Sequence, residues 1–177
     1  MADAPKTNAA RLLEARGIPH RVRVYDAERA FHSADDAAAL LGVPGASVLK
    51  TLVVLREAAG RPKPLLVLVP SDRQLDMKRL GQALGEKRLR MASQREAERL
   101  TGLKVGGISA LAVRAGVFEV LVDASAAGRE RVHVSAGVRG VDLELAVRDL
   151  LTVTGGRLVD TSGGDSNPGT DAGGTGR

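Results

Sequence analysis

The chain of 177 residues contains no cysteine and no tryptophan. Without cysteine, a disulfide scaffold, a thiolate metal site and a cysteine nucleophile are all excluded. Aromatic residues make up only 2% of the chain, so valine, leucine and alanine have to fill its interior. The first residues lack the apolar core of a signal peptide, and no apolar run approaches the length of a membrane span. We therefore expect a soluble, cytoplasmic protein.

The composition as a whole is typical of one globular domain followed by a polar tail. Apolar residues account for 44% of the sequence, which lies in the globular range, and the length suits a single domain with a real core. From residue 161 onward the chain is mostly glycine, serine, threonine and aspartate, and such a composition cannot bury apolar surface. We expect a folded domain over residues 1–160 and a disordered tail over residues 161–177.

Positive charge exceeds negative charge, with a formal net charge of +5. Such an excess favours polyanionic partners, of which nucleic acid is the most common in a cytoplasm. Lysine and arginine are densest between Lys78 and Arg99, a stretch that we call the 78–99 basic segment. This segment is either the solvated face of helices or a surface that follows phosphates, and the sequence leaves both interpretations open.

Short helix and strand patterns alternate along the chain without a regular strand–helix–strand rhythm. Caps such as Ser93, with Glu96 three residues later, and stops such as Gly85 bound the helices. We expect helices over 8–16, 33–42, 76–84, 93–100 and 146–153, and strands over 20–25, 47–55, 65–69, 87–91, 117–123, 130–135, 141–145 and 157–159. Together they predict an α/β (α+β) fold in which helices flank a mixed, largely antiparallel sheet.

One of these strands carries a lysine in its interior. The run from Ser47 to Leu55 predicts a buried strand, because it is continuously apolar and rich in β-branched residues apart from Lys50. Desolvation disfavours the charged form of a buried ammonium that has no partner. One interpretation is a lysine near a strand end whose amine reaches water. The other is a lysine held rigidly at the floor of a pocket for an anionic or carbonyl-bearing ligand.

Several common chemistries find no support in the sequence. The three histidines, His20, His32 and His133, are scattered along the chain, so we expect no metal site. No nucleophile-elbow motif supports a Ser-His-Asp site. The pair Gly106-Gly107 is too short for a standard phosphate-binding loop, which makes nucleotide hydrolysis improbable.

A set of polar residues at strand ends and turns remains as a candidate ligand site: Tyr25, Lys50, Ser109, Ser135 and Asp142. Adjacent glycines, here Gly106-Gly107, let the backbone approach a ligand and direct N–H groups at a carbonyl oxygen. The set suits recognition of an ester beside a sugar hydroxyl. Ordinary explanations stay open, because the glycines can make a turn, Ser135 can end a strand and Asp142 can pair with Arg139 at the surface.

Six short motifs follow one another along the chain. They are Tyr25 after the first strand, Val48-Leu49-Lys50-Thr51-Leu52, Gln74-Leu75-Asp76, Thr101-Gly102, Val105-Gly106-Gly107-Ile108-Ser109, and Val134-Ser135 followed by Gly137, Arg139-Gly140, Asp142 and Glu144-Leu145. In order and spacing these motifs resemble the YbaK/EbsC family from about Ala9 to Val159. That family comprises free-standing aminoacyl-tRNA deacylases related to the editing insertion of bacterial prolyl-tRNA synthetase.

The resemblance implies a curved, partly closed sheet flanked by helices and the hydrolysis of a mischarged aminoacyl-tRNA ester, with Cys-tRNA(Pro) as the best-known substrate. It implies tRNA and prolyl-tRNA synthetase as partners, and no metal or other cofactor. Lys50 falls on the family's essential lysine, expected to fix the substrate's end or to stabilise developing charge. By this resemblance the catalytic candidates are Lys50, Gly106 and Gly107, and the substrate-binding candidates are Tyr25, Phe31, Thr51, Ile108, Ser109, Ser135 and Asp142.

Two departures from the family pattern leave alternatives open. Ala110 stands where the family loop usually has proline, and proline fixes φ and shapes such a loop. Val138 stands where the later loop often has lysine. The alternatives are a catalytically silent module of the same fold that binds tRNA or a synthetase, and a general nucleic-acid binder that uses the 78–99 basic segment.

Overall fold

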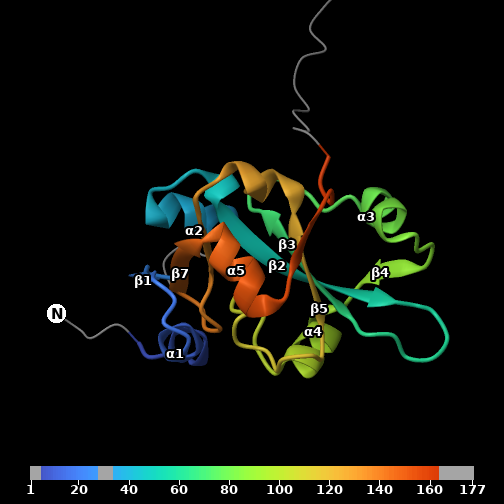
Figure 1. Cartoon of the computed structure of the whole chain (residues 1–177), viewed down its shortest axis with the longest axis horizontal. Coiled ribbons are helices and arrows are strands. Elements are labelled where there is room, and N and C mark those ends of the chain that lie inside the picture. The colour runs from blue at the N-terminus through green and yellow to red at the C-terminus, as the bar shows by residue number, and fades with distance from the viewer. Residues whose placement is uncertain (1–4, 28–33, 164–177) are drawn as a thin grey trace, which may run out of the picture.

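The computed structural model describes residues 5–27 and 34–163, which form five α-helices and eight strands (Figure 1). The helices are α1 (Asn8–Ala15), α2 (Ala34–Leu41), α3 (Met77–Leu84), α4 (Gln94–Thr101) and α5 (Val147–Thr154). The strands are β1 (His20–Val24), β2 (Val48–Arg56), β3 (Leu65–Pro70), β4 (Leu89–Met91), β5 (Glu119–Asp123), β6 (Arg131–Ser135), β7 (Val141–Ala146) and β8 (Arg157–Val159). The element order expected from the sequence is confirmed, with bounds that differ by no more than two residues.

The strands of the described residues form one mixed sheet in the order β1-β7-β6-β2-β3-β5-β8, with β4 paired to β2 outside this path. The pairs β1–β7, β7–β6, β2–β3 and β2–β4 are antiparallel, and the pairs β6–β2, β3–β5 and β5–β8 are parallel. The mixed α/β class is therefore confirmed. The sheet is not closed, and β1 and β8 are its two ends.

One face of the sheet carries the larger core. Leu49 and Val53 of β2 point to it and pack in one cluster with Leu13 of α1, Ala97 of α4 and Leu150 of α5. The apolar surface that these side chains remove from water stabilises the fold by roughly 25 cal/mol per Å². Helices α1, α4 and α5 therefore lie on the same face as the odd-numbered residues of β2.

The opposite face carries two smaller cores. Val54 of β2 packs with Leu80 of α3, and Val48 packs with Leu41 of α2. Because side chains alternate along a strand, Lys50 shares this face and lies in the interval between the two clusters. The lysine that stood out in the sequence thus occupies the place where neither α2 nor α3 covers β2.

Side-chain caps explain where the helices begin. The Asp76 carboxylate accepts hydrogen bonds from the N–H groups of Lys78 and Arg79 at the start of α3. Ser93 and Glu96 form a complete capping box at the start of α4. Such caps satisfy N–H groups that have no partner inside the helix and typically contribute about 1 kcal/mol. The helix starts predicted at these two positions are confirmed.

The folded part continues past residue 160. The Thr161 hydroxyl donates a hydrogen bond of 2.7 Å to the Asp123 carboxylate, and Thr161, Ser162 and Asp123 are all buried. The first two residues assigned to the tail are therefore buried against the domain, and Thr161 donates to the Asp123 carboxylate from both its N–H and its hydroxyl. Residues 164–177, which make up the rest of that tail, lie outside the described residues.

No helix within residues 5–27 and 34–163 combines the length and the apolar character needed to cross a membrane.

Candidate functional site

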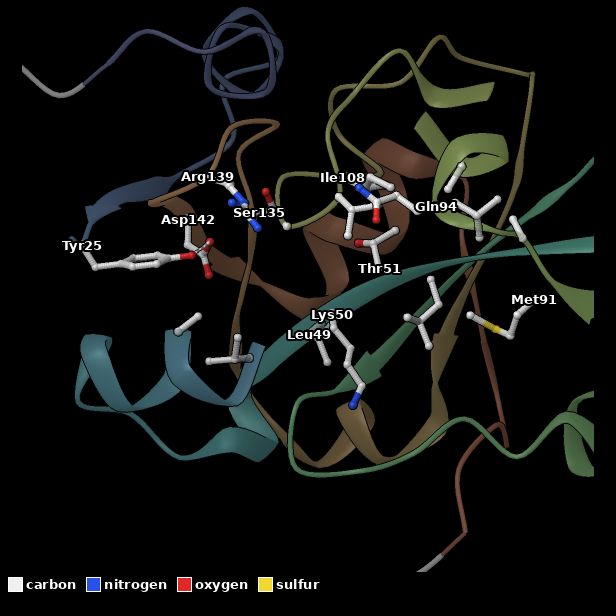
Figure 2. A pocket seen from close by; sticks show the side chains of 18 residues that line it. Tyr25, Leu49, Lys50, Thr51, Met91, Gln94, Ile108, Ser135, Arg139 and Asp142 are labelled. Atoms are coloured by element: carbon white, nitrogen blue, oxygen red, sulfur yellow. Dashed lines mark hydrogen bonds between the residues drawn. The ribbon is translucent and has the colours of Figure 1, made fainter. Parts of the chain in front are cut away.

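A cavity of about 380 Å³ lies over β2, and residues from distant parts of the chain line it (Figure 2). Its polar end is formed by Tyr25, Ser135, Arg139 and Asp142. Its apolar end is formed by Val53, Met91, Ala92, Ala97, Val105 and Ile108. A hollow of this size, mostly apolar with a few convergent polar groups, is typical of a small-ligand site.

Lys50 lines this cavity and is half-buried. Its ammonium donates a hydrogen bond of 3.2 Å to the backbone oxygen of Ser71, just after β3. In Figure 2 the Lys50 side chain points away from Thr51 and from the loop that carries Ile108. The cation is thus held at the site, but on the face of β2 opposite to the glycine loop.

Thr51 points to the other side of the strand, toward the Ile108 loop (Figure 2). Its hydroxyl oxygen is buried and has no hydrogen-bond partner within the described residues. A buried polar atom without a partner loses its water without compensation, which typically costs about 1–3 kcal/mol. A group left in this condition beside a cavity is available to a ligand.

The polar end contains a coupled tyrosine and carboxylate. The Tyr25 hydroxyl donates a hydrogen bond of 3.4 Å to Asp142, whose residue is only 4% exposed. Burial raises the pKa of Asp142 from 3.8 to about 6, and the hydrogen bond from Tyr25 opposes this shift only in part. Burial and the neighbouring Asp142 also raise the pKa of Tyr25. The interpretation of Asp142 as a surface residue is wrong, because the carboxyl is buried in the pocket wall.

The two loop glycines differ in what their amides can do. Gly106 lines the cavity, whereas the Gly107 N–H donates a hydrogen bond of 2.8 Å to the backbone oxygen of Lys104. A side chain at Gly107 would come within 3.0–3.1 Å of the Val138 backbone, so this loop packs directly against the loop that carries Arg139. Of the pair, Gly106 alone is positioned to face a ligand.

The structure brings most of the predicted site residues together. Those that line the cavity are Tyr25, Lys50, Thr51, Gly106, Ile108, Ser135 and Asp142. Gly107 does not line it, and neither does Ser109, which is fully buried and accepts a hydrogen bond of 3.1 Å from the Leu111 N–H. Phe31 lies outside the described residues.

Sequence reasoning missed the residues at the far end of the cavity, Met91 and Gln94. Both lie at the junction between β4 and α4, where the sequence showed a short strand and a capping box but no sign of a pocket. Met91 is 43% exposed although it is a large apolar residue, and Val105 beside the glycine loop is 39% exposed. Apolar side chains exposed at the mouth of a cavity are typical of a surface that a ligand covers.

A family model described as the aminoacyl-tRNA editing domain matches residues 28–153, which is well over half of the chain. The chain belongs to the aminoacyl-tRNA editing domain family. The resemblance carried by the six sequence motifs is thereby confirmed. Within this editing domain, the motif around Lys50, the glycine loop and the segment from Ser135 to Asp142 converge on one cavity.

The editing-domain chain is similar to a protein named as a deacylase and to a segment of a much longer ligase. It is 30% identical over 155 residues to EbsC of Enterococcus faecalis, a candidate Cys-tRNA(Pro)/Cys-tRNA(Cys) deacylase, with 88% of this chain and 92% of EbsC covered. It is 32% identical over 155 residues to the proline–tRNA ligase of Anaeromyxobacter sp. strain K, but spans only 23% of that enzyme.

A solved structure supports the fold. The crystal structure of a candidate trans-editing enzyme for prolyl-tRNA synthetase superimposes with a TM-score of 0.75 at 25% sequence identity, with 90% of this chain and 99% of that chain covered. The expected YbaK-like editing fold is confirmed by this match.

Proposed function

We propose that this protein is a trans-editing aminoacyl-tRNA deacylase, which hydrolyses the ester between an amino acid and the 3′ end of a mischarged tRNA. Cys-tRNA(Pro) is the substrate that fits best, because the EbsC relative is named for it and is covered almost in full. The observation that carries the proposal is the convergence of Lys50, Thr51, Gly106 and Asp142 on one cavity in a chain of the editing family.

The reaction consumes water and releases the free amino acid and a tRNA with an intact 3′ hydroxyl. Gly106 can direct its amide at the oxyanion that forms when water attacks the ester carbonyl, and such a donor typically contributes a factor of about 10²–10³ in rate. Asp142, hydrogen-bonded to Tyr25, is suited to hold a ribose hydroxyl or the attacking water at the polar end. Lys50, on the other side of β2, is suited to fix a phosphate or the backbone of the tRNA end.

The partners of the proposed enzyme are the aminoacylated 3′ end of tRNA and prolyl-tRNA synthetase. Support for the first comes from the family and from the positive net charge of the chain. Support for the second comes from the proline–tRNA ligases among its relatives, which contain a similar segment within a much longer chain.

The test is a deacylation assay over a panel of mischarged tRNAs, with cysteinyl-, alanyl- and seryl-tRNA(Pro) included. We expect the wild type to hydrolyse at least one of them and Lys50→Ala to lower kcat/KM by about 100-fold or more. Lys87→Ala, a change of an exposed lysine outside the cavity, serves as the matched control and retains activity. No hydrolysis of any member of the panel, or equal activity of the two lysine variants, would refute the proposal.

A silent binding module of the same fold is the second candidate, favoured by Val138, which is 45% exposed at the position where the family often has lysine. Such a module would bind tRNA or the synthetase without turnover, so robust hydrolysis in the same assay excludes it. The third interpretation, a general binder that uses the 78–99 basic segment, is weakened by ion pairs. Arg79 pairs with Asp160 and Arg90 pairs with Glu96, both at 2.8–2.9 Å.

A further inference from the structure

The edge of β2 that faces the cavity is paired at both ends and open in the middle. Along its other edge, β2 pairs with β3 continuously from Leu49 to Val54. The cavity edge pairs with β6 at Val48 and Leu49 and with β4 from Val54 onward. The interval between these two partners is at most a few residues long, and Thr51 lies at its centre.

The hydrogen-bond pattern fixes which residue directs its backbone into this interval. In an antiparallel ladder, successive residues direct their N–H and C=O groups alternately to the two sides of the strand. The Ser71 N–H donates to the Val48 oxygen on the β3 side, and the Ala92 N–H donates to the Val53 oxygen on the cavity side, at 2.8 and 2.9 Å. Odd-numbered residues therefore face the cavity side, and the N–H and C=O of Thr51 point into the gap.

The gap exists because the chain that follows β4 turns away from the sheet at Ser93, before Gln94 could pair with Thr51. The antiparallel register that places Ala92 opposite Val53 would place Gln94 opposite Thr51. Ser93 instead caps α4, and its capping box with Glu96 turns the chain away from the strand. On the other side, the parallel pairing with β6 ends at Leu49. The position opposite Thr51 is consequently vacant and belongs to the cavity.

In Figure 2 the Thr51 side chain lies between those of Ser135, at the end of β6, and Gln94, at the start of α4. The buried Thr51 hydroxyl, which has no partner within the described residues, is a second and independent sign that a ligand belongs here. Buried backbone and side-chain polar groups in folded proteins are nearly always paired. A single residue with an unpaired hydroxyl and an open backbone edge therefore indicates a place where a partner is supplied from outside.

We infer that the vacant position opposite Thr51 is a binding site for the aminoacyl group of the substrate. This group would pair with the main chain of Thr51 as a single residue of a neighbouring strand does. An α-aminoacyl ester carries an ammonium donor and a carbonyl acceptor with the spacing of one peptide residue. In a closely paired antiparallel position the ammonium donates to the Thr51 oxygen and the carbonyl accepts from the Thr51 N–H. The inference deepens the deacylase proposal and rests on it for the identity of the ligand.

The register also sets the direction and the hand of the ligand. A residue that continues the path of β4 runs from the Met91 end toward Ser135, so the ester oxygen and the ribose lie at the polar end with Asp142. Directly paired strand residues place their side chains on the same face, so the side chain of an L-amino acid lies beside Thr51, close to Ile108. A D-amino acid held by the same two hydrogen bonds would direct its side chain to the face of Lys50.

Amide hydrogen exchange at Thr51 tests the inference on the full chain. The probe is a stable amide analogue of the substrate, 3′-(L-cysteinylamino)-3′-deoxyadenosine, compared with the analogue that carries 3-mercaptopropionate and lacks only the amino group. We expect the Thr51 N–H to exchange faster than the Leu52 N–H in the free protein, because Leu52 faces β3, and to become at least 10-fold slower with the saturating cysteinyl probe. Unchanged exchange at Thr51, or absence of binding, would overturn the inference.

Deacylation provides the second readout. We expect tRNA(Pro) charged with 3-mercaptopropionate or with D-cysteine to be hydrolysed with a kcat/KM about 10- to 100-fold lower than that of L-cysteinyl-tRNA(Pro), because one hydrogen bond to a charged group or the position of the side chain is lost. Equal rates on all three would refute main-chain recognition while the deacylase proposal survives. A wild type inactive on every mischarged tRNA would refute the deacylase proposal, and exchange at Thr51 would still decide the inference.

Discussion

Two polar side chains at opposite ends of β2, Arg56 and Thr51, differ in whether they find hydrogen-bond partners inside the fold. At its C-terminal end, Arg56 donates hydrogen bonds to Glu86 at 2.8 Å, to Glu119 and to the Lys63 oxygen at 2.6 Å, and Glu119 also binds Arg157. At its N-terminal half, the Thr51 hydroxyl has no partner within the described residues. The Arg56 guanidinium is satisfied inside the fold and stabilises it, whereas the Thr51 hydroxyl is left for a ligand.

This contrast predicts that changes at the cavity end alter function and pH response, while changes at the Arg56 end alter stability alone. The contrast would fail if a variant at the cavity end changed neither function nor pH response, or if a variant at the Arg56 end changed function.

The largest effect is expected from Asp142→Asn, measured as the pH dependence of stability. Burial raises the pKa of Asp142 to about 6, so between pH 4 and pH 6 the native state holds a proton that the unfolded chain has lost. Relative to the variant, whose amide has no such proton to lose, wild-type stability should therefore fall by about 3 kcal/mol as pH rises through this window. Urea unfolding of both proteins at pH 4, 5, 6 and 7 measures the difference, and parallel pH curves would contradict it.

An intermediate effect is expected from Arg56→Met at the other end of the strand. The methionine keeps the apolar stem but leaves Glu86 and Glu119 without their shared cation, which should cost about 2 kcal/mol because the arginine side chain is 11% exposed and the carboxylates about a third. The kcat/KM of the folded fraction should not change. Arg90→Met removes an arginine whose side chain is 43% exposed and pairs with Glu57 and Glu96. It is the matched control with a smaller loss, so equal unfolding midpoints for the two variants would count against the contrast.

The smallest effect on stability is expected from Thr51→Val. Valine keeps the shape and removes a hydroxyl that has no partner, so the unfolding free energy should stay within about 0.5 kcal/mol of the wild type or rise. Because the hydroxyl lies in the proposed substrate site, KM for cysteinyl-tRNA(Pro) should increase a few-fold. A loss of stability above about 1 kcal/mol would show that the hydroxyl has a partner in the folded protein.

Local signals made most of the fold predictable. The Ser93 capping box, the Asp76 cap and the apolar run around Lys50 each depend on residues that are neighbours in sequence, so their elements could be placed from the sequence alone. The contact that holds Thr161 gives no local signal, because its partner Asp123 lies 38 residues away.

The site was only partly predictable for a similar reason. The motifs named Lys50, Thr51 and Asp142 through their family resemblance, but the open edge at Thr51 depends on where two distant strands, β4 and β6, stop pairing with β2. The presence of Gln94 in the cavity wall depends on the same arrangement, and the Gly107 N–H is not available to a ligand because it donates to the Lys104 oxygen. No local sequence pattern indicates either feature.

The close approach at Gly107 has a mechanical consequence. A methyl group on its α-carbon would come within 3.0–3.1 Å of the Val138 and Arg139 backbone, which is closer than ordinary van der Waals contact, so an alanine at this position would have to push the two loops apart. Because Gly106 and Arg139 both line the cavity, such a change would alter the separation of two of its walls.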